Sequence, residues 1–209
     1  MSELLQLTSE EMEYVENSIR SLFPNHDQLF ILHEIESKYC HSDIGILFTS
    51  NKDSGLPVIL FTLGCSAAKV ILDDTKYQSF EMIYKLPRSA FADDLSEDMC
   101  SICGRNPRMS IEIVKEEYRY IIDDLLKLSK LPALTGEYYG NGHTIEINSD
   151  RSVGLLSFSN SDHKCHDFNL YHIVYLNKNQ LERIIKSKDL ERQKILYSIL
   201  RYNDATLND

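Results

Sequence analysis

The sequence contains no tryptophan, only 5 prolines and 8 glycines among 209 residues, and no long uninterrupted apolar run. The longest apolar segments, such as residues 56–64, are broken by Pro57 and Thr62. They fall far short of the roughly 20 residues that a membrane-spanning helix requires. The first residues also lack the basic and then apolar pattern of a signal peptide. With 43% hydrophobic and 26% charged residues, these absences predict a globular, cytoplasmic protein.

Basic side chains are also in deficit, because 22 lysines and arginines stand against 32 aspartates and glutamates, for a formal net charge of -10. Such a chain repels nucleic-acid backbones and anionic membranes at long range, so we expect neither as a partner. A basic protein would be attracted instead. The acidic residues gather at 73–74, 93–98 and 123–124, which is typical either of solvated surface or of a surface for such a partner.

The cysteines are few, odd in number and irregularly spaced: Cys40, Cys65, Cys100, Cys103 and Cys165. Reduced thiols are the simplest interpretation in a chain that shows no export signal. Cys100 and Cys103 have the two-residue spacing of half a zinc site, which the loop carrying His163, Cys165 and His166 would have to complete. The separation of the two halves does not fit a compact zinc motif. We therefore expect neither a metal nor another cofactor.

Hydrophobic periodicity predicts a helix followed by strands in the first half of the chain. Thr8 and Glu11 can form a capping box for an N-terminal helix within residues 1–24, which ends at Pro24. Apolar or alternating runs predict strands at 28–36, 41–48, 57–62 and 80–86. The segments 69–78 and 89–107 show no clear period, so we interpret both as irregular, the second with at most a helical turn.

The second half begins with the clearest helix, predicted over residues 111–130 and ended by Pro132. Strands are expected near 144–147, 153–158 and 169–176. Asn177 and Gln180 then cap a helix whose predicted buried face carries Leu181, Ile184 and Ile185. A last helix is expected over 190–201, with a frayed tail from Asn203. This order predicts one α+β domain, residues 1–209, with a central mixed, largely antiparallel β-sheet flanked by helices.

Three of the eight glycines fall within seven positions, in the segment from Gly136 to Ile145. Glycine reaches positive φ without steric cost, and Asn-Gly is a strong tight-turn signal. The backbone is therefore expected to make a specific bend that presents Asn141 and His143. Two interpretations remain open for His143. It is either a structural residue beside the turn or the base of an active site.

An active site would need a nucleophile near that base. Cys65 or Ser66, which follow Gly64, form the best available assembly with His143, and a small hydrolase or thiol enzyme is the alternative hypothesis. The segment 64–68 is not a Gly-x-Ser-x-Gly elbow, and the chain has no glycine-rich phosphate loop and no His-Glu-x-x-His helix. We favour a protein without catalytic activity.

Taken in order, several motifs resemble the suppressor of fused family in its short bacterial form. The resemblance covers residues 26–188 and rests on His41-Ser42-Asp43-Ile44, Thr62-Leu63-Gly64-Cys65-Ser66, the strand ending at Leu86-Pro87, Gly142-His143-Thr144-Ile145, and the strand 172–176 before Gln180. Its landmark residues are Asp43, Thr62, Gly64, Ser66, Pro87, Gly142 and His143. Two departures concern Cys65, which stands where methionine is usual, and residues 92–108, which replace a tryptophan-bearing segment.

The resemblance implies a protein-binding domain with a mixed sheet flanked by helices. Short bacterial relatives are thought to be immunity proteins that neutralise toxins, so the implied partner is a cognate toxin, for which a basic nuclease would suit the acidic charge. The expected partner-binding residues are Asp73, Asp74, Asp93, Asp94, Glu97, Asp98, Tyr138, Tyr139 and Asn141. Tyrosines are favoured anchors in interfaces. The sequence leaves the oligomeric state open.

Overall fold

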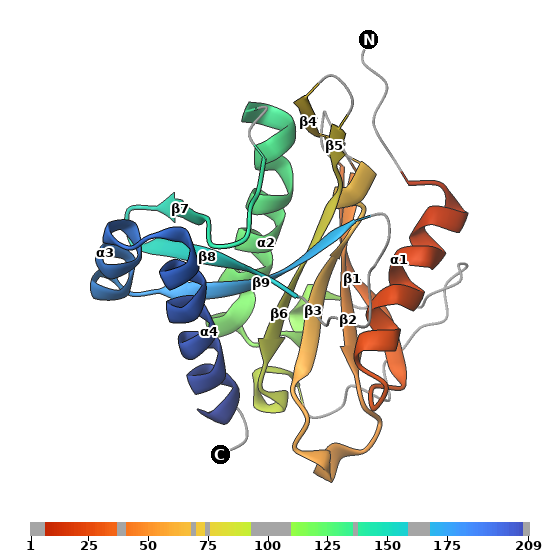
Figure 1. Ribbon diagram of the computed structural model, residues 1–209. Helices are drawn as coiled ribbons and strands as arrows, with labels where there is room; N and C mark the ends of the chain where they lie inside the picture. Colours follow the sequence, from red (N-terminus) through yellow and green to blue (C-terminus); the bar gives the residue numbers. More distant parts are fainter. Residues whose placement is uncertain are drawn as a thin grey trace.

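The computed structural model describes residues 7–36, 41–67, 70–73, 76–92, 110–135, 138–158 and 168–206. Seven of its strands form one sheet in the order β1-β2-β3-β6-β9-β8-β7 (Figure 1). The strands are β1 (Gln28–Glu36), β2 (His41–Phe48), β3 (Val58–Leu63), β6 (Phe80–Leu86), β7 (Thr144–Asn148), β8 (Arg151–Ser157) and β9 (Asn169–Leu176). The predicted α+β class and mixed sheet are confirmed.

Neighbouring strands pair antiparallel throughout this sheet, except that β6 and β9 run parallel at its centre. The register of that parallel pair sets Ile83 opposite His172. Because side chains alternate between the faces of a strand, Glu81, Ile83 and Lys85 share one face of β6. The central pair therefore brings together polar side chains from segments far apart in the sequence.

Helices cover both faces of the sheet (Figure 1). On one face, α2 (Glu116–Thr135) packs Ile121, Ile122 and Leu125 against the strands. On the other face, α1 (Ser9–Leu22) packs on the half formed by β1, β2 and β3, whereas α3 (Lys178–Lys186) and α4 (Asp189–Thr206) pack on β8 and β9. This second face is thus shared by two separate groups of helices.

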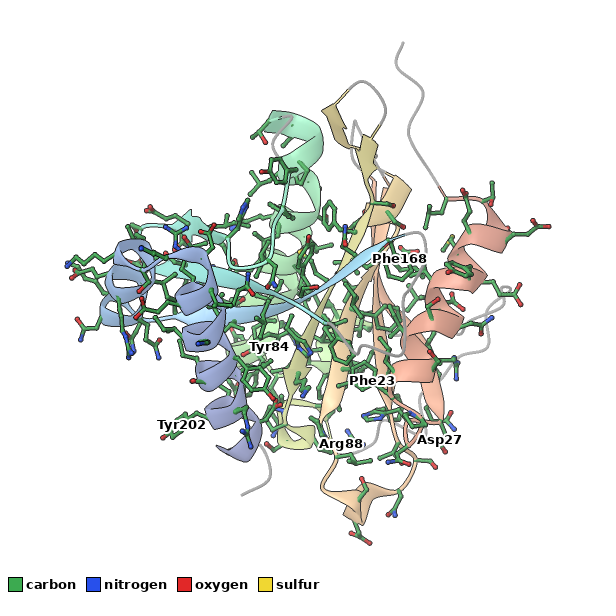
Figure 2. All side chains as sticks on the ribbon, viewed as in Figure 1. Phe23, Asp27, Tyr84, Arg88, Phe168 and Tyr202 are labelled. Carbon is green, nitrogen blue, oxygen red and sulfur yellow. The ribbon has the colours of Figure 1, made fainter. Side chains whose placement is uncertain are left out.

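The two groups meet through aromatic side chains that follow β8 and α1. Phe158, just after β8, lies 5.8 Å from the ring of Phe23 at the end of α1, centroid to centroid. Figure 2 places Phe23 and Phe168 between α1 and the sheet, whereas Tyr202 points away from the sheet near the end of α4. Phe158 therefore marks the border between the two halves of this face.

Local sequence signals position the helix ends. Thr8 accepts the backbone N–H of Glu11 and the Glu11 carboxylate accepts that of Thr8, which confirms the predicted capping box. Asn177 and Gln180 make the same reciprocal pair at α3. Within the described ranges, short 3-10 turns fill four connections: η1 (Lys52–Ser54), η2 (Cys65–Ala67), η3 (Arg88–Ala90) and η4 (Ile111–Ile113).

Two segments differ from the sequence prediction in their secondary structure. Residues 69–78 were expected to be irregular, but β4 (Val70–Asp73) and β5 (Lys76–Gln78) pair antiparallel as a separate two-stranded sheet. The helix predicted over 111–130 begins only at Glu116, after the 3-10 turn η4. The apolar residues of that turn, Ile111 and Ile113, pack against the main core, which explains why the periodicity extended too far toward the N-terminus.

The same helix also passes through Pro132, where the sequence predicted its end, and continues to Thr135. Proline has no N–H, so the carbonyl of Leu128, four residues earlier, loses its usual partner. The hydroxyl of Tyr139 donates to that carbonyl at 2.7 Å. A side chain from the following turn therefore replaces the missing helical hydrogen bond. The local sequence of the helix does not predict this replacement.

The last two helices carry smaller corrections. Ile185 was predicted on the buried face of α3 but is 58% exposed, because Ile184 and Leu181 already fill the contact with α4 and β9. The tail from Asn203 was expected to fray, yet α4 extends to Thr206. Its last turn is held to the sheet by an ion pair of 2.7 Å between Asp204 and Lys85 of β6.

Candidate functional site

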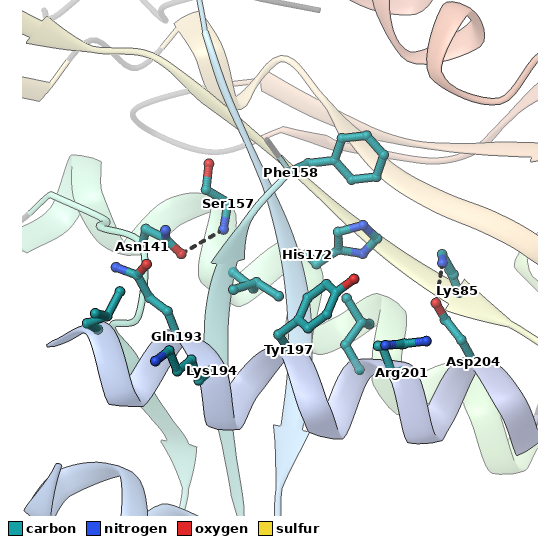
Figure 3. A pocket seen from close by; sticks show the side chains of 13 residues that line it. Lys85, Asn141, Ser157, Phe158, His172, Gln193, Lys194, Tyr197, Arg201 and Asp204 are labelled. Atoms are coloured by element: carbon teal, nitrogen blue, oxygen red, sulfur yellow. Dashed lines mark hydrogen bonds and ion pairs between the residues drawn. The ribbon is translucent and has the colours of Figure 1, made fainter. Parts of the chain in front are cut away.

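A cavity of about 590 Å³ lies between α4 and the strands β6, β8 and β9. We call it the α4 cavity. Its lining comprises Lys85, Asn141, Leu156, Ser157, Phe158, His172, Leu190, Gln193, Lys194, Tyr197, Leu200, Arg201 and Asp204 (Figure 3). Small-molecule pockets commonly measure about 300–1,000 Å³, so its size is that of a ligand site.

The inner wall of the α4 cavity is formed by His172 and Phe158, whose rings stack with centroids 4.8 Å apart. His172 is 5% exposed, and its ring makes no hydrogen bond to any residue in the described part of the chain. Burial, and secondarily the positive charge of Lys85, lowers the pKa of His172 to about 3. The imidazole is therefore neutral at pH 7, with one nitrogen able to donate and one able to accept.

Lys85 and Asp204 hold the end of α4 against β6 beside this histidine. Both also line a second cavity of about 290 Å³, together with Tyr84, Tyr118 and Tyr120. His172 belongs to both linings as well. The ion pair and the imidazole therefore stand where the two cavities adjoin.

The outer wall comes from α4, where Lys194, Tyr197 and Arg201 recur at intervals of three and four residues on one side of the helix (Figure 3). The guanidinium carbon of Arg201 lies 5.9 Å from the centre of the Tyr197 ring. Lys194 and Arg201 are exposed and have no ion-pair partner among the described residues. Two uncompensated cations thus border the cavity.

The glycine-rich turn supplies another part of the rim. Gly142 has a φ of 88°, which confirms the tight bend. The Asn141 side chain accepts the backbone N–H of Ser157 at 2.9 Å, and both residues line the cavity. Asn141, chosen from the sequence as a binding residue, is therefore placed beside an open site.

The histidine of this turn lies against other parts of the turn. The His143 ring lies 5.6 Å from that of Tyr138, and a Cβ added to Gly140 would stand only 2.6 Å from His143 Nε2.

Tyr138 is 53% exposed, as a partner-binding residue requires. Tyr139 is 6% exposed, so its assignment to the partner surface is wrong. Its ring packs on Phe80 and its hydroxyl is bonded to Leu128, which makes it part of the core.

The landmark Thr62-Leu63-Gly64-Cys65-Ser66 surrounds the carboxyl group of Glu81. Thr62 and Ser66 each donate a hydroxyl hydrogen bond to it at 2.7 Å, and the backbone N–H groups of Gly64 and Ser66 donate at 3.1 and 3.0 Å. We call these four donors the Glu81 cradle. Gly64 has a φ of 115°, which favours glycine there. Burial raises the pKa of Glu81, and the hydrogen bonds from the cradle oppose that rise.

Burial also bears on the alternative hypothesis of an enzyme. Cys65 is fully buried and Ser66 is 5% exposed, and the Ser66 hydroxyl already donates to Glu81. Neither residue lines either of the two cavities described above. Two further landmarks are structural, since Asp43 is buried in β2 and Pro87 ends β6.

Of the acidic clusters, only part falls within the described residues. Asp73 ends β4, whereas Asp74, Asp93, Asp94, Glu97 and Asp98 lie outside the described ranges. In the third cluster, Asp123 is exposed but Asp124 is 1% exposed, which corrects the interpretation of that cluster as solvated surface. Asp124 forms two hydrogen bonds with the Arg151 guanidinium and accepts a third from the Tyr175 hydroxyl.

Metal and membrane binding can be examined only where the structure describes the chain. Cys100, Cys103, His163, Cys165 and His166 lie outside the described ranges. Among the residues that are described, no group of three or more His, Cys, Asp or Glu side chains could hold a metal ion. None of the described helices combines the length and apolar character needed to cross a bilayer.

The arrangement of one seven-stranded mixed sheet with α2 on one face and α1, α3 and α4 on the other is the α+β fold of the suppressor of fused type. A crystal structure with this fold is that of a protein from Neisseria gonorrhoeae described as a suppressor of fused (SUFU) homologue. It matches 90% of this chain and 88% of its own with a TM-score of 0.55 and 11% sequence identity. The resemblance read from the motifs is thus confirmed at the level of the fold. No family model matches the sequence, and no curated protein does.

Sequence reasoning missed most of the α4 cavity. Lys85 and His172 are ionisable side chains within the mainly apolar central strands Phe80–Leu86 and Asn169–Leu176. A polar side chain in such a strand needs either a partner or a cavity, which is the signal that could have singled them out. Lys194, Tyr197 and Arg201 gave no comparable signal, because exposed charges and tyrosines are ordinary on a surface helix.

Proposed function

We propose that this chain is a protein-binding domain that acts as a bacterial immunity protein, which binds a cognate toxin and blocks it. The observation that carries the proposal is the suppressor of fused type of fold, which extends over 90% of the chain. The resemblance to short bacterial members of that family supplies the link to immunity. Such a protein needs a complementary surface and no catalytic group of its own.

Charge supports a basic partner. The formal net charge of -10 would accelerate encounter with a basic toxin such as a nuclease, because opposite charges steer association. The acidic residues assigned to this role are Asp73, Asp74, Asp93, Asp94, Glu97 and Asp98. Their contribution is expected chiefly in the association rate and in its sensitivity to salt.

The glycine-rich turn offers an anchor for the partner. Tyr138 is 53% exposed, and its ring is held against that of His143 instead of extending freely into solvent. An aromatic side chain that is already ordered loses little conformational entropy when a partner covers it. Tyr138 therefore fits the centre of an interface.

The test is co-expression with the protein encoded beside the gene. Growth should stop when that protein is produced alone and recover when this chain is produced with it. Purified components should form a complex whose association slows as salt is raised. If neither rescue nor a complex is obtained with any neighbouring gene product, the immunity proposal fails.

A pair of variants tests the surface. Tyr138→Ala should weaken the complex by about 1–3 kcal/mol, the range of an interface anchor. Tyr14→Ala is the matched control, because Tyr14 is a 40% exposed tyrosine on α1 and lies outside the turn. Equal losses from the two variants would show that the turn is not the binding surface.

A further inference from the structure

The α4 cavity differs in charge from the rest of the protein. The chain carries 32 acidic and 22 basic residues, yet the lining contains Lys85, Lys194 and Arg201 against the single acid Asp204. Asp204 is paired with Lys85, so Lys194 and Arg201 are the cations left to attract a ligand. In an acidic protein, this local excess of positive charge favours an anion at this place.

The cavity also contains a buried polar group that the described part of the protein does not satisfy. His172 is 95% buried, lines the cavity and has no hydrogen-bond partner among the described residues. Its nitrogens are not among the fully buried, unpaired polar atoms of the described residues, so we expect them to meet water or a ligand in the cavity. Because the imidazole remains neutral, it can both donate to and accept from the edge of a polar ring.

The remaining lining suits a planar molecule. The Phe158 ring, stacked on His172, and the Tyr197 ring below Arg201 provide aromatic surfaces on the inner and outer walls. Aromatic faces bind heterocyclic bases by stacking. Gln193 and Asn141 add side-chain amides, and the Asn141 amide nitrogen stays available because the hydrogen bond to Ser157 uses only its oxygen.

We propose that the α4 cavity binds a small phosphorylated compound with a planar ring, of the size of a nucleoside monophosphate. The phosphate lies beside Arg201 at the wall formed by α4, where Lys194 adds positive charge, because guanidinium and ammonium groups bind phosphate through charged hydrogen bonds. The ring lies against Phe158 and Tyr197, with its polar edge toward His172. This assignment is independent of toxin binding and holds or fails separately from it.

The proposal is tested by calorimetric titration of the full chain with AMP, GMP, CMP and UMP. At least one should bind with a Kd below about 1 mM, and its nucleoside and inorganic phosphate should each bind at least about tenfold more weakly. Binding should also shift the His172 imidazole resonances in the NMR spectrum. If no monophosphate binds, or if the nucleoside or phosphate alone binds as tightly, the assignment is wrong.

Two sets of variants locate the site. The double variant Lys194→Ala/Arg201→Ala should weaken monophosphate binding by at least about tenfold, since it removes both charged hydrogen-bond donors. Lys178→Ala/Lys188→Ala is the matched control, because it also removes two exposed positive charges but neither side chain lines the cavity. Retained affinity in the first pair, or an equal loss in the second, would overturn the assignment. Thermal unfolding of each variant verifies that it is folded.

Discussion

Glu81 and His172 are both buried polar side chains on the central strands β6 and β9, and they face the same side of the sheet. The protein fills the hydrogen-bonding capacity of Glu81 with four donors from residues 62–66. It leaves His172 without a partner among the described residues and beside a cavity of about 590 Å³. The Glu81 carboxyl group is therefore closed off from any ligand, whereas the His172 imidazole is accessible to a ligand in the cavity.

The comparison separates buried residues that stabilise the fold from accessible residues that can meet a partner or ligand. The residues that carry the family resemblance, Thr62, Gly64 and Ser66, build the cradle around Glu81 and have no exposed chemistry. A partner or ligand is instead expected where side chains remain accessible, at Tyr138 and around the α4 cavity. Substitutions at four residues, Glu81, His172, Tyr139 and Asn141, test this division.

The largest effect is expected from Glu81→Ala. The substitution leaves four buried donors without an acceptor, which should lower the free energy of unfolding by about 3–5 kcal/mol. Glu81→Gln should cost distinctly less, because its carbonyl oxygen can still accept from Gly64 and Ser66. Chemical denaturation of both variants provides the measurement, and equal losses would mean that the cradle is not what stabilises this position.

His172 should make stability depend on pH. Its folded pKa of about 3 lies below the usual value of 6.5, so the unfolded chain binds a proton that the folded chain does not. The contribution of neutral His172 to the free energy of unfolding is therefore complete above pH 6.5, and it is lost as the pH falls toward 3. Between pH 6.5 and 4.5 the loss should reach about 2 kcal/mol.

The variant His172→Phe isolates this contribution from the titration of the carboxyl groups. It keeps an aromatic ring against Phe158 but cannot bind a proton, so its stability should fall by about 2 kcal/mol less over the same pH range. Lys85, Asp204, Lys194 and Arg201, which line the cavity with His172, are present in both proteins. Parallel curves of unfolding free energy against pH would contradict a neutral, buried His172.

Tyr139 extends the comparison to the opposite face, where its hydroxyl donates to the carbonyl that Pro132 leaves without a partner. Tyr139→Phe should cost about 1 kcal/mol. In a Pro132→Ala background the cost should become much smaller, because the N–H of the alanine can bond to Leu128 itself. A double-mutant cycle measures this coupling, and a coupling energy of zero would mean that the hydroxyl does not compensate for the proline.

The fold could be predicted where local patterns carry the information. The capping boxes at Thr8 and Asn177 and the strands from 28 to 62 lie within a residue or two of their predicted positions. The passage of α2 through Pro132 could not be predicted, because it depends on a hydroxyl that arrives from Tyr139 in another segment. Tertiary contacts thus overrule the local signal of proline.

The candidate site was less accessible to sequence reasoning. Asn141 and Tyr138 could be chosen because the glycines around them predict a bend that exposes side chains. The adjacent Tyr139 has the same local signal but is buried, because its ring packs on Phe80 and its hydroxyl is bonded to Leu128. The α4 cavity is lined by residues 85 and 172 and by residues within 193–204. No spacing along the sequence predicts that these segments lie close together.

The smallest effect is expected at the rim of the cavity. Asn141→Ala removes the acceptor for the Ser157 N–H, but this hydrogen bond is exposed and water can replace it. The free energy of unfolding should fall by only about 0.5 kcal/mol. Asn141→Asp keeps an acceptor oxygen and should unfold like the parent, yet its negative charge beside the cavity should weaken the binding of a monophosphate. If thermal unfolding instead showed that Asn141→Ala destabilises the protein as much as Glu81→Ala, the rim of the cavity would be a structural part of the fold. The contrast between the closed Glu81 cradle and the open α4 cavity would then be wrong.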